Sequence, residues 1–186
     1  MSTTETLTAN QALTGFVKIW QVDPSTGDTL LIVDKPNMIL TAGTKIIAKT
    51  LGGDNNYKIW GMYIGYNNSA SFTPPAIVQS YSSPFSGFTS PFGYLREPLT
   101  FDPSYMSTTG YDSNTVLFST MITTASKQGG ADFTHNVSNI YEVALVAAPT
   151  GVVGGDVVFS RTNFTPIRYD STYNFTITWG VRILLP

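Results

Sequence analysis

The chain has 186 residues, no cysteine and a net charge of −2, and only 12% of its residues are charged, about half of the roughly 25% found in average globular proteins. This length corresponds to one domain that can bury a core without covalent cross-links. The lack of cysteine excludes disulfides and thiolate metal sites. The slightly acidic balance argues against nucleic acid and anionic membranes as partners, because both select basic surfaces.

Residues 1–13 are rich in threonine and have no hydrophobic periodicity, so we expect an extended N-terminal arm that a neighbouring molecule orders. The arm has no basic segment leading into an apolar run, which is the pattern of a secretory signal. No stretch of the chain approaches the ~18 apolar residues of a membrane span. We therefore expect a protein made in the cytoplasm, with residues 14–186 forming a single β-rich domain.

The first two predicted strands, over residues 15–20 and 30–33, flank a strong turn sequence. Between Asp23 and Asp28 the chain reads DPSTGD, in which proline presets φ and glycine supplies a positive φ. The two strands are therefore expected to form a β-hairpin. The turn carboxylates could hold calcium, as could residues 54–56, but neither segment matches an EF-hand loop, and hydrogen bonds within Asx turns explain them better.

One short helix is predicted, over about 41–51, with Thr41 as its N-cap. The pair Gly52–Gly53 is expected to end the helix, and a strand over residues 59–66 follows. We expect the apolar face of the helix to consist of Ile46, Ile47 and Leu51. Lys45 and Lys49 are expected on the opposite face.

Residues 67–94 are rich in proline and phenylalanine, and the phrase Ser-Pro-Phe occurs in them twice. Prolines at this density exclude central strands and helices, and so long a loop in a compact domain is usually functional. We expect this loop to pack on a neighbouring subunit through its aromatic side chains. The candidate contact residues are Tyr81, Phe85, Phe88, Phe92 and Tyr94.

The rest of the chain is predicted to consist of strands, over residues 95–101, 116–123, 140–147, 157–161 and 172–184. In the last of these, apolar residues alternate with polar ones over the 11 residues 173–183, which predicts a long central strand. Strands separated by turn signals indicate an all-β, antiparallel sandwich or jelly-roll-like fold. The tryptophans lie in strand runs among apolar residues, so we expect them in the core rather than on a sugar-stacking platform: Trp20, Trp60 and Trp179.

Candidates for catalysis are few. The single histidine, His135, has no nucleophile frame around it and is interpreted as a loop residue. Glu142 lies within a predicted strand, and a buried carboxylate there could be catalytic. We favour an ion pair with an arginine such as Arg161 or Arg182, which would fix the register of two strands. The sequence therefore predicts neither an enzyme nor a cofactor or metal site.

Five short phrases of the chain have a familiar pattern. In the first half they are PNMILTAG at 36–43 and MYIG at 62–65. In the second half they are YEVAL at 141–145, VFSRTNFTPI at 158–167 and TITW at 176–179. Together they resemble small virion proteins of tailed bacteriophages, and this resemblance implies residues of the fold rather than an active site.

The resemblance, which spans residues 36–183, implies a structural, oligomeric and often trimeric component of the virion. The chain has no heptad or other shaft repeat, which favours a compact piece on a larger scaffold over a fibre. We expect a capsid decoration (cement) protein that packs against itself, as a homotrimer, and against the major capsid protein or tail proteins. The alternatives are a tail or baseplate accessory protein, and a carbohydrate-binding module for host recognition with exposed loop tyrosines such as Tyr81, Tyr94 and Tyr111.

Overall fold

The structure is a computed structural model, and it describes residues 13–54, 56–66, 95–100, 115–122, 139–149, 157–168 and 172–183. The predicted arm of residues 1–13 lies outside this part of the chain except for Leu13, which begins the first strand. The Pro/Phe-rich loop of residues 67–94 and the loop with His135 also lie outside it.

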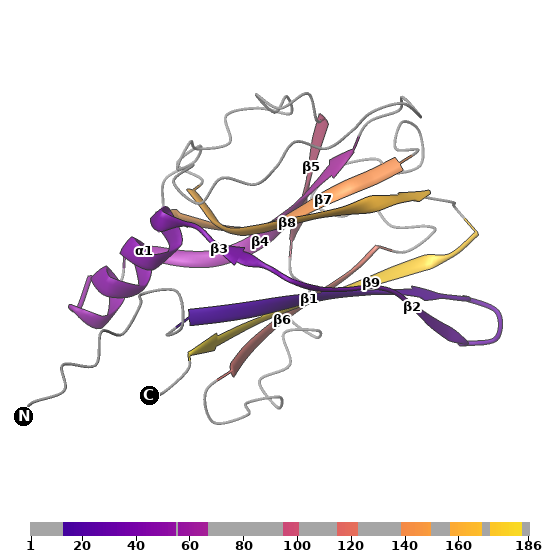
Figure 1. Cartoon of the computed structure of the whole chain (residues 1–186), viewed down its shortest axis with the longest axis horizontal. Coiled ribbons are helices and arrows are strands. Elements are labelled where there is room, and N and C mark those ends of the chain that lie inside the picture. The colour runs from indigo at the N-terminus through magenta and orange to yellow at the C-terminus, as the bar shows by residue number, and fades with distance from the viewer. Residues whose placement is uncertain are drawn as a thin grey trace, which may run out of the picture.

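Two antiparallel sheets and one short helix make up the described residues, so the predicted β-sandwich is confirmed (Figure 1). The first sheet has the strand order β2-β1-β9-β6, formed by β1 (Leu13–Val22), β2 (Thr29–Pro36), β6 (Thr115–Ile122) and β9 (Asn174–Ile183). The second has the order β3-β8-β7-β4-β5, formed by β3 (Met38–Ile39), β4 (Tyr57–Tyr66), β5 (Leu95–Thr100), β7 (Asn139–Pro149) and β8 (Val157–Arg168). The helix α1 (Thr41–Leu51) connects β3 to β4.

The strand β9 is the centre of the first sheet, as its sequence pattern predicts. It pairs with β1 on one side and β6 on the other. Its inward side chains are buried in the core between the sheets, with Phe175, Ile177 and Trp179 at most 1% exposed. On its other face, the hydroxyls of Thr178 and Ser119 are hydrogen-bonded across the sheet at 2.9 Å. Period-two alternation thus separates an apolar face from a polar one.

The tryptophan predictions have three different outcomes. Trp179 is fully buried in the core, as expected. The expectation for Trp20 is wrong: it is half-buried and pairs with Thr176 in the register of β1 with β9. Its neighbour Ile19 is buried in the core, so alternation places Trp20 on the opposite face of the sheet. Trp60 lies outside the described side chains.

The predicted hairpin is confirmed, and its turn is held by local hydrogen bonds. β1 and β2 pair antiparallel on either side of the turn. The Asp23 carboxylate accepts hydrogen bonds from the backbone N–H of Ser25 at 2.8 Å and of Thr26 at 3.3 Å. Gly27 adopts a φ of 77°, which side chains with a Cβ rarely adopt. These are the Asx-turn contacts that the sequence indicates.

The start of α1 differs from the prediction. Thr41 is the first helical residue, and the N-cap is Leu40, which has an extended conformation and makes no side-chain cap. The Leu40 N–H donates to the carbonyl oxygen of Phe159 at 3.0 Å, and its side chain is fully buried against strands of the second sheet. Tertiary packing therefore decides where the helix begins. Its end at Gly52 and Gly53, with φ of 90° at Gly53, is as predicted.

The buried face of α1 is also shorter than predicted. Its buried residues are Ala42, Gly43 and Ile46, all in the first half of the helix. Leu51, expected on the buried face, is 83% exposed. The reason is the position of the helix, because α1 contacts β8 while its last turn extends past the ends of the sheets (Figure 1).

Candidate interaction surface

An open apolar groove lies where α1 meets the end of the sandwich. It has a volume of about 430 Å³ and is lined by side chains of α1 and of both sheets. Ile46, Ile47 and Leu51 contribute from the helix, while Val116 and Phe118 contribute from β6. The groove exists because the last turn of α1 projects beyond the sheets, so that residues patterned for a core line a wall open to solvent.

Several side chains of the groove remain exposed although they are strongly apolar. Leu51 is 83% exposed and Val116 is 37% exposed. Covering a Leu or Val side chain is worth about 1.5–3 kcal/mol relative to leaving it in water. A surface that covered this groove would therefore gain hydrophobic free energy that the isolated chain lacks.

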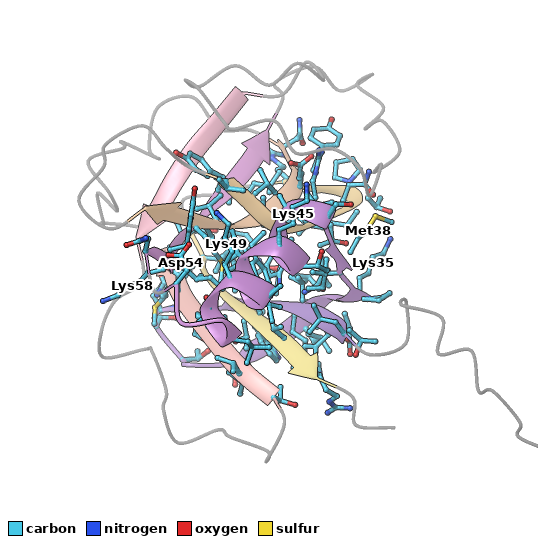
Figure 2. The ribbon with its side chains drawn as sticks, turned by 90° about the vertical axis from the view of Figure 1, so that its left-hand side faces the viewer. Lys35, Met38, Lys45, Lys49, Asp54 and Lys58 are labelled. Carbon is cyan, nitrogen blue, oxygen red and sulfur yellow. The ribbon has the colours of Figure 1, made fainter. Side chains whose placement is uncertain are left out.

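Lysines lie at the same end of the molecule as the groove, and one of them, Lys58, lines it. Figure 2 shows Lys45 and Lys49 on α1, Lys58 on β4 and Lys35 at the end of β2. The Lys49 ammonium lies 3.9 Å from the Asp54 carboxylate and 5.4 Å from the centre of the Tyr57 ring. Within the part of the chain that the structure describes, the other three lysines are exposed and have no ion pair. We call the groove together with these four lysines the α1 end.

The opposite end of the sandwich carries the turn between β1 and β2 (Figure 1). Its two carboxylates, on Asp23 and Asp28, have no basic residue between them in the sequence. Hydrogen bonds from the hydroxyl and the backbone amide of Ser25 hold the pKa of the Asp23 carboxyl below its usual value. Directly after the turn, Leu30 is 62% exposed and Leu31 is 43% exposed. We call residues 23–31 the hairpin tip.

The predicted partner of Glu142 is Arg161, which confirms the ion-pair hypothesis. Arg161 Nη2 lies 2.5 Å from Glu142 Oε2, and both side chains are only 1% exposed. Arg161 stands opposite Ala144 in the register of β7 with β8, so Glu142 is its diagonal neighbour on the same face. Arg182, the other candidate, instead donates from Nε to the Thr115 hydroxyl at 3.2 Å. The pair links two neighbouring strands deep in the second sheet.

The structure does not place the interaction residues predicted from the sequence. All five lie outside the described residues, and so does Tyr111. The five are Tyr81, Phe85, Phe88, Phe92 and Tyr94. Sequence reasoning missed the α1 end, although it placed Lys45 and Lys49 on the outward side of the helix. The available signal was the surplus of lysines between residues 35 and 58 of an acidic chain.

The described residues contain no cluster of three or more histidine, aspartate or glutamate side chains that could hold a metal ion. No helix among them is both long and apolar enough to cross a membrane. Comparisons with protein-family models, with curated proteins and with solved structures found no match. The geometry of the α1 end and of the hairpin tip is therefore the basis for a functional proposal.

Proposed function

We propose that the chain is a non-enzymatic structural protein of a tailed-phage virion, which stabilises the particle as a capsid decoration (cement) protein. The observation that supports an assembly role is the α1 end, where an apolar groove and exposed Leu51 are left in solvent beside a group of lysines. Apolar side chains exposed together with charged neighbours are typical of surfaces that another protein covers.

The sequence resemblance over residues 36–183 supports the virion as the place of assembly. The low share of charged residues, 12%, fits a molecule whose surface is partly covered by other subunits. In a virion, many weakly binding copies act together, so a modest contact at each site sums to a strong clamp through multivalency. The partners in this proposal are further copies of the chain and the capsid or tail proteins that carry them.

The test is incorporation into particles. Particles of the encoding phage, made without this chain, are incubated with the purified full-length protein and then sedimented. Co-sedimentation at a fixed, saturable ratio to the major capsid protein is expected, together with greater resistance of the particles to heat. A Lys18→Met variant, which changes an exposed ion pair on the first sheet, serves as a folded control and should co-sediment as the unchanged chain does. A protein that stays in the supernatant at all concentrations would contradict the proposal.

A further inference from the structure

We propose that the α1 end is the docking site for a second copy of this chain, which places its hairpin tip over the apolar groove. This inference rests on the proposed assembly function and specifies the two surfaces through which copies join. It is carried by the shape of the groove, by the charges of the two surfaces and by their positions in the sandwich.

The shape of the groove favours a protein surface over a small ligand. Small-molecule sites enclose most of their ligand's surface. Here Leu51, in one wall, is 83% exposed, and Val116, in another, is 37% exposed. A small apolar molecule in this groove would stay largely in water, whereas a protuberance from another protein could cover the exposed side chains and the lysines around them.

The charges of the hairpin tip are complementary to those of the α1 end. The tip carries the carboxylates of Asp23 and Asp28, and its turn sequence contains no basic residue. The α1 end carries four lysines and one aspartate, Asp54, and three of the lysines have no ion pair within the described residues. Surfaces of opposite sign steer two molecules into one orientation and disfavour the others.

Exposed apolar side chains are also present on both surfaces. Leu30 and Leu31 follow the acidic turn directly and are 62% and 43% exposed. The tip thus combines aspartates with exposed leucines, and the α1 end combines lysines with an apolar groove. Leu30 is the side chain that we assign to the groove, with Asp28 next to Lys45 or Lys58.

The position of the two surfaces makes this contact intermolecular. The hairpin tip and α1 lie at opposite ends of the sandwich (Figure 1), so the tip of one copy cannot reach the groove of the same copy. Each copy then offers one tip and one groove to its neighbours. Such a head-to-tail contact closes into a ring when its rotation closes and otherwise continues as a chain of copies.

Sedimentation velocity of the full-length protein tests the proposal, with one charge reversed on each surface. Lys45→Glu on the α1 end and Asp28→Lys on the hairpin tip should each weaken self-association roughly five- to tenfold, since one exposed attraction becomes a repulsion. Arg168→Glu, a reversal of the same size at an exposed position at the end of β8 and outside both surfaces, is the control and should leave association within about twofold of the unchanged chain.

A mixture of the two variants distinguishes a head-to-tail contact from a symmetric one. Lys45→Glu keeps an intact tip and Asp28→Lys keeps an intact α1 end, so an equimolar mixture should recover the association that is weakened in each variant alone. The chain carrying both reversals should also associate, because the charges are exchanged rather than lost. No recovery in the mixture would overturn the head-to-tail arrangement.

Carbodiimide cross-linking of the unchanged chain provides a second measurement that does not depend on variants that fold. It should join Asp28 of one copy to Lys45 or Lys58 of another, detected between isotopically light and heavy copies by mass spectrometry. If the unchanged chain associates but neither reversal weakens it and these cross-links are missing, the docking site is wrong while self-assembly stands. If the unchanged chain does not associate at any concentration, the self-packing on which the inference rests is itself contradicted.

Discussion

Removing one partner of the buried ion pair between Glu142 and Arg161 should strongly destabilise the fold. Both side chains are 1% exposed and their charged atoms are 2.5 Å apart. Replacing either one with methionine leaves the other charge buried without its partner, which costs about 3–5 kcal/mol. Against a total stability of about 5–15 kcal/mol for a domain of this kind, such a loss removes a large part of the free energy of unfolding.

The double variant, with Glu142→Met and Arg161→Met together, should lose much less than the sum of the single variants. Two methionines fill a similar volume and leave no buried charge, so the coupling between the sites should be at least about 4 kcal/mol. Both side chains have further interactions besides this ion pair, so the double variant should still lose about 1–2 kcal/mol.

The assay is equilibrium unfolding in urea, followed by tryptophan fluorescence at one fixed low protein concentration, because self-association would shift the apparent stability. The matched control is the exposed pair between Lys18 and Asp34, with side chains 37% and 54% exposed and 3.6 Å apart. Lys18→Met should cost at most about 1 kcal/mol. Single variants of the buried pair that are no worse than this control, or that add up to the double variant, would refute the reasoning.

Four further substitutions test the packing of α1 and the turn chemistry. Gly43→Ala should destabilise the fold by about 1–2 kcal/mol in thermal or urea unfolding, since the new Cβ would collide with the Phe159 carbonyl oxygen and the cost of overpacking exceeds the gain of roughly 1 kcal/mol in helix propensity. Ile46→Ala should cost about 2–4 kcal/mol and Leu51→Ala less than about 0.5 kcal/mol, since Ile46 is 8% exposed and Leu51 83% exposed; equal losses would show that the last turn packs as the first does. The folded pKa of Asp23 lies below the unfolded value of 3.8, so its contribution to stability is complete above that pH and is lost as the pH falls through the folded pKa. The difference in stability between the unchanged chain and Asp23→Asn should therefore shrink below pH 3.8. A titration of the Asp23 carboxyl followed by NMR with a midpoint above 3.8 would contradict this.

The elements that could be predicted from the sequence are those that local chemistry determines. β9 follows from period-two alternation, because a sheet with one buried face requires it. The hairpin follows from its turn residues, in which Asp23 and Gly27 perform the roles that their side chains allow. Glu142 could be assigned an arginine partner because a buried carboxylate needs one, although only the register of β7 with β8 distinguishes Arg161 from Arg182.

Other elements depend on contacts that no local pattern contains. β3 has only two residues and exists through its pairing with β8. β8 runs to Arg168, well beyond its predicted end, because Pro166 falls within the irregular pairing between Ile140 and Glu142 of β7, where a missing N–H disrupts no regular ladder.

The α1 end illustrates the same limit for the candidate site. The outward lysines of the helix are visible in its 3.6-residue pattern. The groove is not visible in that pattern, because it forms only where the last turn of α1 passes the ends of both sheets. The strands that line it are distant from α1 in the sequence. Leu51 shows why pattern alone misleads, since its spacing matches a core position while its place in the fold leaves it in solvent.

The solution mass of the purified full-length chain, measured by light scattering across about two decades of concentration, tests the central claim most directly. A structural protein that packs against copies of itself should show a mass that rises with concentration toward a defined multiple of 20.2 kDa, with a trimer expected from the sequence resemblance. This mass should fall when salt is raised, because lysine–carboxylate contacts between exposed surfaces are screened. A mass of 20.2 kDa at every concentration would contradict self-assembly as the function of the chain.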